Sequence, residues 1–163
     1  MPEGATGLIL KTRASHITLL ILRVLLGGLF LEAGLDKLIS GSFSAAGFLS
    51  ASQGPFASFY SGLPSNTSLL PVINNLVIWG EILIGIALVL GVLVRFASFL
   101  GIVQMILYYT ASLPPSTGWI SQHIIFIAVF VVFLFSGVGY FMGLDKLIWK
   151  LETEKNPLRF LVG

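Results

Sequence analysis

The sequence predicts an all-α membrane protein, a bundle of four transmembrane helices with a short helical lid on the outer side and an amphipathic C-terminal tail. Of its 163 residues, 56% are hydrophobic and 10% are charged, whereas soluble domains carry charge on about a quarter of their residues. Four apolar runs approach the roughly 20 residues that a helix needs to cross a hydrocarbon core of about 30 Å. We therefore expect residues 1–163 to form a single membrane domain.

The four predicted spans cover residues 17–39, 70–94, 96–113 and 119–142. The first run is too long and too charged for a cleavable signal peptide, so we expect it to be retained. The second and third runs are separated only by residues 93–96, which predicts a tight hairpin. Residues 114–118, with Pro114, Pro115 and Gly118, predict a second tight turn on the opposite side.

The basic residues outside the spans predict the orientation of the chain. Threading four helices alternately places all of them on one side, and they are Lys11, Arg13, Arg95, Lys146, Lys150, Lys155 and Arg159. By the positive-inside rule that side is the cytoplasm. We therefore expect a protein of the cell (plasma) membrane with both termini in the cytoplasm.

The outer connection over residues 40–69 carries no charged residue, and aromatic side chains alternate there with Ser, Ala and Gly. It predicts one or two short interfacial helices, broken at residues 54–55 and ended at residues 63–64, that cover the outer end of the bundle. Asn66 begins an N-glycosylation acceptor pattern, so it is a candidate glycan site. Residues 144–163 predict an amphipathic tail on the cytoplasmic surface.

Ionisable residues inside the apolar runs are the candidates for function, because each costs about 2.5 to 3.5 kcal/mol near the bilayer centre without a partner. At 100° per residue, one face of the first helix carries Arg23, Gly27, Phe30, Gly34 and Lys37. Glu32 lies on the opposite face, so both sides of this helix should be enclosed. We interpret the glycines as positions of close contact with a neighbouring helix.

Arg23 and Glu81 have positions along their helices that allow an ion pair. One interpretation is structural: the pair neutralises two buried charges and fixes the register of the helices. The other is functional, because Arg23 and Glu81 are also suited to orient a quinone head group or to relay a proton.

A second candidate site combines Glu32 with His123 in the outer third of the membrane, near Trp119. A carboxylate and an imidazole at that depth are suited to couple quinone reduction to proton transfer, although a single interfacial His is often only a packing residue. We therefore predict Glu32, Glu81 and His123 as catalytic groups and Arg23 and Trp119 as further quinone contacts. Lys37 is predicted either to attract an anion or to pair with Asp36 at the outer edge.

Several chemistries are not expected from this sequence. It contains no cysteine and two histidines, so we expect no disulfide, no thiolate metal site and no bis-histidine haem. It shows no nucleotide-binding loop and no nucleophile set, and we expect no metal, no nucleotide and no nucleic-acid partner. The expected ligands are quinone and membrane lipid.

Three segments together resemble a known family, namely LRVLLGGLFLEAGLDKL from Leu22, GEILIGIALVLGVLVR from Gly80 and SGVGYFMGLDKL from Ser136. They resemble the DoxX/DoxD family of four-helix membrane proteins. For the DoxD branch, this resemblance implies the membrane subunit of thiosulfate:quinone oxidoreductase, which oxidises thiosulfate to tetrathionate and passes electrons to quinone. It also implies a separate DoxA-like small subunit as partner.

Two hypotheses about function follow from the residues and the resemblance. In the first, the chain is a quinone-linked oxidoreductase subunit, with thiosulfate as the electron donor. In the second, it is a non-catalytic accessory subunit of a terminal quinol oxidase or respiratory supercomplex, where its buried charges hold the bundle and dock partner subunits. A transporter is less well supported, because the sequence has no clear inverted repeat or broken helix.

Overall fold

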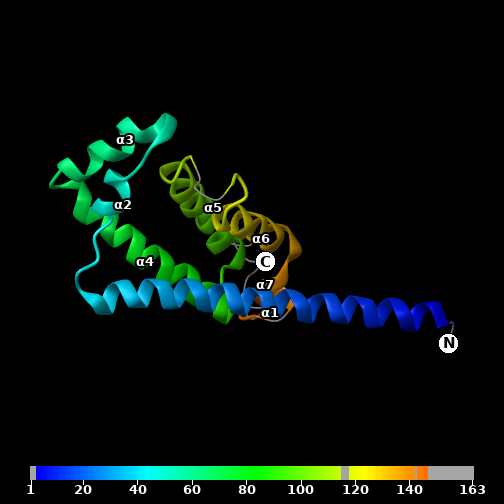
Figure 1. Ribbon diagram of the computed structural model, residues 1–163. Helices are drawn as coiled ribbons and strands as arrows, with labels where there is room; N and C mark the ends of the chain where they lie inside the picture. The colour runs from blue at the N-terminus through cyan, green and yellow to red at the C-terminus, as the bar shows by residue number, and fades with distance from the viewer. Residues whose placement is uncertain (1–2, 115–117, 142, 147–163) are drawn as a thin grey trace, which may run out of the picture.

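The computed structural model describes residues 3–114, 118–141 and 143–146, and these form helices joined by short turns (Figure 1). The longest helices are α1 (Glu3–Ser40), α4 (Leu69–Leu90) and α5 (Val94–Ala111). Residues Ala14–Ser40 of α1, together with α4 and α5, are long and apolar enough to cross a membrane. These three helices agree closely with the predicted spans 17–39, 70–94 and 96–113.

The fourth apolar run folds differently from the prediction. The helix α6 (Gln122–Ser136) has 15 residues, which rise about 22 Å and fall short of a hydrocarbon core of about 30 Å. It ends because Gly137 adopts a left-handed conformation with φ of 64°, as glycine commonly does after a helix. A short helix, α7 (Val138–Phe141), follows, so the fourth apolar run folds as two helices rather than as one.

Glycines set the close contact between α1 and α4. Figure 1 shows α1 along one edge of the molecule with the other helices on one side of it, and its most extensive contact is with α4. A Cβ atom at Gly34 would lie 2.7 Å from Cγ1 of Ile82, and one at Gly85 would lie 2.5 Å from the backbone nitrogen of Leu31. The prediction that Gly34 allows close packing is confirmed, and Gly85 has the same role on α4.

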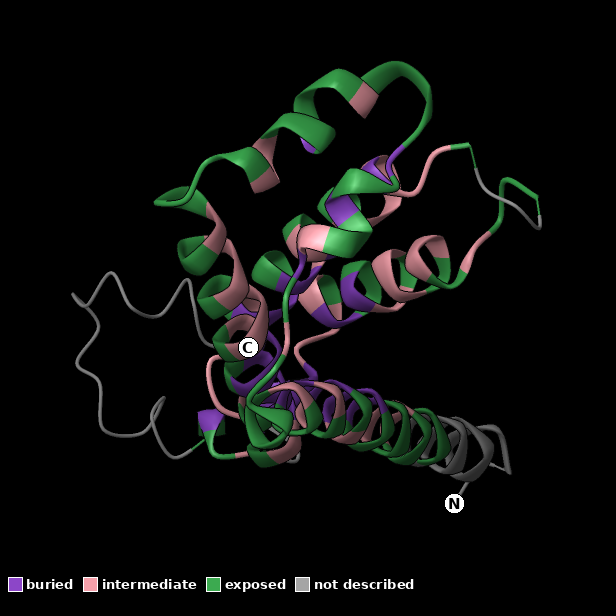
Figure 2. Ribbon diagram, turned by 60° about the vertical axis from the view of Figure 1, so that its left-hand side comes forward, coloured by how far each residue is buried: buried purple, intermediate pink, exposed green. Residues whose placement is uncertain are grey.

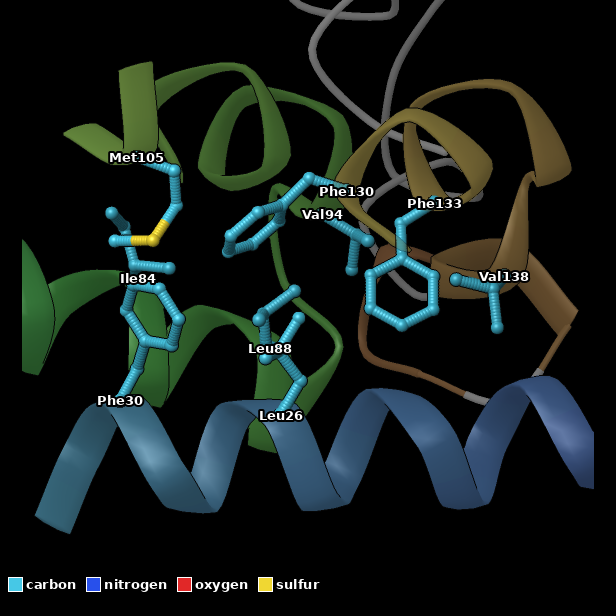
Figure 3. Packing of buried hydrophobic residues seen from close by; sticks show 9 residues of the cluster. All are labelled: Leu26, Phe30, Ile84, Leu88, Val94, Met105, Phe130, Phe133 and Val138. Carbon is cyan, nitrogen blue, oxygen red and sulfur yellow. The ribbon is translucent and has the colours of Figure 1, made fainter. Parts of the chain in front are cut away.

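The main apolar core lies where α1, α4, α5 and α6 meet (Figure 3). Phe30 of α1 contacts Phe130 of α6 edge-on, with ring centroids 5.3 Å apart. Phe130 in turn fills the space over Gly101 of α5. The buried members of this core are Leu26, Phe30, Ile84, Leu88, Val94, Met105, Phe130, Phe133 and Val138.

The connection between α1 and α4 contains α2 (Ala46–Ser50), the 3-10 turn η1 (Gly54–Phe56), α3 (Ala57–Gly62) and the 3-10 turn η2 (Leu63–Ser65). This agrees with the predicted short helices and with both predicted breaks. Two hydrogen bonds fix the connection to the long helices: Ala45 N–H donates to Oδ1 of Asn74 at 2.9 Å, and Tyr60 shares one with the Thr110 hydroxyl at 2.7 Å. The connection is therefore packed on α4 and α5.

Three further predictions concern the C-terminal tail, the outer turn and Asn66. The amphipathic helix predicted for residues 144–163 lies outside the described residues after position 146, and the predicted turn at 114–118 includes three such positions. Asn66 accepts hydrogen bonds from the backbone N–H groups of Ser68 and Leu69 through Oδ1. It therefore helps to begin α4, and its glycosylation stays a prediction.

Candidate functional site: an ion pair between two cavities

Glu81 of α4 is the centre of a polar cluster inside the helices. Glu81 is only 4% exposed, and its Oε2 accepts a hydrogen bond from Nζ of Lys37 on α1 at 2.7 Å. Its other oxygen, Oε1, accepts one from the hydroxyl of Tyr108 on α5 at 2.9 Å. Three helices thus each contribute one polar group to this cluster, which we call the Glu81 cluster.

Gln104 extends the cluster by one further hydrogen bond. Its Nε2 donates to the Tyr108 oxygen at 2.9 Å, so that the Tyr108 proton is directed to Glu81. Both Glu81 oxygens therefore act as acceptors, which is the arrangement of an ionised carboxylate. Lys37 also donates to the backbone oxygen of Ala33 at 3.1 Å and lies 5.6 Å from the centre of the Phe43 ring.

Two cavities flank the Glu81 cluster. Both are lined by Lys37, Glu81, Tyr108 and His123. The first, of about 230 Å³, lies between α1, α5 and α6, and its other lining residues are Leu29, Phe30, Ala33, Met105, Gln122 and Phe126. The second, of about 260 Å³, lies beneath the connection after α1, and its other lining residues are Phe43, Ser44, Ala45, Phe48 and Val77. Each cavity thus combines apolar walls with the same charged groups.

His123 lies in the first turn of α6, between the two cavities. Its ring meets that of Tyr108 edge-on, with centroids 6.1 Å apart, and its Nδ1 is 3.3 Å from the Ser121 hydroxyl oxygen. The imidazole therefore lies beside the Glu81 cluster, and within the described residues it makes no direct hydrogen bond to Glu81. Within residues 3–114, 118–141 and 143–146, no group of three His, Asp or Glu side chains is arranged to hold a metal ion.

Two predicted site residues lie elsewhere. Glu32 is exposed on α1 and does not line either cavity, so its predicted association with His123 was wrong. The reason is its place on the helix, since it lies opposite the face that Arg23 and Lys37 share. Trp119 is 73% exposed and is absent from both cavity linings, and its backbone oxygen accepts a hydrogen bond from the Tyr109 hydroxyl.

Arg23 does not pair with Glu81, and this prediction was also wrong. Its side chain lies near the opposite end of the apolar core, where Nη1 donates to the backbone oxygen of Val138 at 3.0 Å. Arg23 interacts electrostatically there with Asp145, and neither residue is more than 2% exposed. Arg23 and Lys37 are 14 positions apart, or about 21 Å along a helix, so only Lys37 reaches Glu81.

Asp145 fixes the turn between α4 and α5. Its Oδ1 accepts a hydrogen bond from Leu93 N–H at 2.6 Å and its Oδ2 accepts one from Val94 N–H at 3.1 Å. Leu93 has a positive φ of 49°, an uncommon conformation for a residue with a side chain, and the carboxylate helps to hold it. Asp145 was predicted to lie in the surface tail over residues 144–163, but it is fully buried. We call Arg23 and Asp145 the Asp145 cluster.

Tyr108 and Gln104 belong to the candidate site but were not predicted. Tyr108 is followed by Tyr109 in an apolar run, and tyrosines near the end of a span commonly mark the membrane interface. The helical spacing gives one usable signal, because Gln104 and Tyr108 are four positions apart and share a face of α5. Lys37 was assigned to the outer edge, although the same spacing places it on the packed face of α1.

The fold and the site define a class of protein: a helical membrane protein with a buried ion pair between two cavities. Comparison with family models then identifies the family, since the DoxX model matches residues 18–112. This range is more than half of the chain, so the chain belongs to the DoxX family. It includes Lys37, Glu81 and Tyr108. The comparisons with curated proteins and with solved structures gave no match.

Proposed function

We propose that this chain is the quinone-binding membrane subunit of a respiratory oxidoreductase. In this proposal α1, α4, α5 and the segment formed by α6 and α7 together make a four-helix bundle in the cell membrane. Both termini are cytoplasmic, and the connection over residues 40–69 covers the outer end of the bundle. The observation that carries the proposal is the Glu81 cluster, where a buried ion pair and His123 face two apolar-walled cavities. Binding sites for small organic molecules commonly combine apolar walls with a few placed polar groups.

The chemistry of the cluster suits a quinone head group. A quinone carbonyl needs hydrogen-bond donors, and Lys37 has three donor hydrogens, of which its bonds to Glu81 and Ala33 use two. Reduction to the quinol consumes two electrons and two protons. Glu81 and His123 are the groups beside the cavities whose side chains can take part in acid–base chemistry. Each cavity is slightly smaller than the roughly 300 Å³ of the smallest typical ligand sites, which suits a single ring.

Thiosulfate is the electron donor that we propose, on the basis of the resemblance to the DoxD branch. Two thiosulfate ions each give up one electron, a sulfur–sulfur bond forms between them to give tetrathionate, and quinone takes up the two electrons with two protons. Lys37 is the cation nearest the cavities, and its charge is offset by Glu81. A dianion therefore needs further positive charge, which we assign to a DoxA-like small subunit.

The accessory-subunit hypothesis remains the second candidate. A specific observation favours it, namely the exposed position of Glu32 and Asp36 on α1, because charged groups at such positions are commonly satisfied by another protein. In this case the chain would associate with a quinol oxidase and the cavities would have no catalytic role.

Quinone labelling tests the main proposal. The full complex is purified from native membranes and irradiated with an azido-substituted short-chain quinone. We expect the label on peptides of α1, α5 or α6 that line the cavities, and at least about tenfold less labelling in Glu81→Gln, a loss of about 1.4 kcal/mol in binding. Trp79→Phe on the exposed face of α4 is the matched control. Labelling that is unchanged in a normally assembled Glu81→Gln complex would refute quinone binding at this site.

A second measurement separates the donor from the quinone site. Thiosulfate-dependent quinone reduction is followed in the same preparations, with tetrathionate measured as the product. We expect this rate to fall with the labelling in Glu81→Gln. If the cavity is labelled but thiosulfate drives no quinone reduction in the intact complex, the quinone site stands and the thiosulfate assignment fails.

A further inference from the structure

One exposed face of α1 differs from the exposed faces of α4 and α5 because it carries charge. Seven exposed residues on this face recur at alternating intervals of three and four, as residues do along the seam between two packed helices. These residues, which we call the α1 stripe, are Thr18, Leu22, Leu25, Leu29, Glu32, Asp36 and Ile39. Figure 2 shows exposed residues along the coloured part of α1. The stripe lies opposite the glycines that pack on α4, so the described chain leaves it uncovered.

The α1 stripe carries two carboxylates within the apolar span Ala14–Ser40. Glu32 is eight residues before the end of α1, or about 12 Å along the helix. Among the described residues, no hydrogen bond or ion pair involves the side chain of Glu32 or Asp36, and both side chains are exposed. A carboxylate facing lipid at this depth costs about 2.5 kcal/mol or more, so the stripe requires a partner.

The exposed face of α4 provides the comparison. It has the same alternating intervals from Leu76 onward, and its exposed members are Leu76, Trp79, Leu83, Ile86 and Leu90. The exposed residues of α5 are likewise apolar, and they are Phe96, Phe99, Leu100, Val103, Ile106 and Leu107. These faces are suited to lipid as they stand. Only the α1 stripe, among the exposed faces of these three helices, interrupts its apolar surface with charge.

A second copy of this chain does not fit the α1 stripe. Two copies related by a twofold axis along the membrane normal would bring four carboxylates together, and like charges repel strongly where the dielectric constant is low. The cation at the matching depth is Lys37, which each copy already uses for its own Glu81. A partner helix of opposite charge removes both difficulties.

We propose that the α1 stripe is the docking surface for a transmembrane helix of a different polypeptide, one that carries Lys or Arg at the level of Glu32 and Asp36. Charge complementarity fixes the depth of the two helices relative to each other, while the leucines below provide apolar contact. This inference concerns a different surface from the Glu81 cluster and does not depend on quinone binding.

Site-specific cross-linking tests the docking surface. A photoreactive amino acid replaces Leu25 of the full chain in native membranes, and Leu83 of the α4 face is the matched control position. We expect Leu25 to form an adduct with another polypeptide, cross-linked within a transmembrane segment that contains Lys or Arg. We expect the Leu83 position to give no such adduct. The combined variant Glu32→Gln and Asp36→Asn should reduce the adduct by at least about tenfold.

A charge exchange makes the test specific. Replacing the basic residue of the partner by Glu should abolish the adduct, and Glu32→Lys should restore it. Adducts only between copies of this chain, adducts only with lipid, or an unchanged yield in the Glu32→Gln and Asp36→Asn variant would each overturn the proposal. Azidoquinone labelling of the cavities is measured in the same membranes, and its loss or retention bears on the proposed function alone.

Discussion

The Glu81 cluster and the Asp145 cluster are both buried charge pairs that join α1 to other helices, but they differ in what surrounds them. Arg23 and Asp145 are at most 2% exposed and are enclosed by backbone, and a Cβ atom at Gly91 would lie 2.6 Å from Nη1 of Arg23. The Lys37 side chain is 25% exposed and faces two cavities. A pair without space around it can only hold the fold, whereas a pair beside a cavity can also meet a ligand.

A repeated motif sharpens this comparison. The sequence GLDKLI occurs at residues 34–39 and again at 143–148. In the first copy Lys37 pairs with Glu81 and Asp36 is exposed. In the second copy Asp145 is buried and accepts a hydrogen bond from Leu93 N–H, while Lys146 is exposed. The same residues therefore take opposite roles according to which side chain faces the other helices.

The largest expected effect is that of Asp145→Ala. It leaves the N–H groups of Leu93 and Val94 without their acceptor and removes the anion beside Arg23. Breaking a buried charge pair in this way costs about 3–5 kcal/mol, so we expect a large fall in the melting temperature of the purified protein in detergent. Asp36→Ala in the other GLDKLI copy is the control and should leave the isolated chain unchanged. Equal melting temperatures would contradict the structural role of Asp145.

Glu81→Gln should reduce quinone labelling strongly and stability only moderately, whereas Asp145→Ala should act mainly on stability. We expect a smaller loss of stability, about 1–2 kcal/mol, because Lys37 keeps its hydrogen bond to Ala33 and partial contact with the cavity. The double variant Lys37→Met and Glu81→Gln should recover part of that loss in thermal unfolding, because it leaves no unpaired charge. Stability losses that are strictly additive would show that the two groups do not interact.

Tyr108→Phe tests the third member of the Glu81 cluster. It removes the donor to Oε1 of Glu81 and the acceptor for Gln104. We expect a stability loss of about 1 kcal/mol in chemical unfolding, with a fewfold decrease in quinone labelling. The control is Tyr109→Phe, because Tyr109 is the adjacent residue and lines neither cavity. Identical quinone labelling of the two variants would show that Tyr108 is not part of the ligand site.

Tyr60→Phe should have the smallest effect, since it removes one hydrogen bond between α3 and α5. The expected cost is about 0.5–1 kcal/mol, confined to the connection. Limited proteolysis should show faster cleavage between α2 and α4, while the melting temperature changes little. A large fall in melting temperature would mean that the connection supports the whole fold.

The positions of α1, α4 and α5 could be predicted because long apolar runs with glycine and proline at their ends have few alternative structures. The fourth helix was predicted too long, since nothing in the apolar run over 119–142 marks Gly137 as the position where the helix ends. Helical spacing correctly placed Arg23 and Lys37 on the packed face of α1. It could not say which cation meets Glu81, because that depends on the register that Gly34 and Gly85 set between α1 and α4.

The apolar core between the two clusters has a consequence for the energetics of the membrane. Leu26, Leu88, Phe130 and Phe133 pack together in the apolar core where α1, α4, α5 and α6 meet (Figure 3), and their side chains carry no group that could pass on H⁺. If the proposed quinone reduction takes place beside Glu81, we expect its H⁺ to come from the side of the bilayer on which the Glu81 cluster lies. Turnover would then consume H⁺ on that side alone.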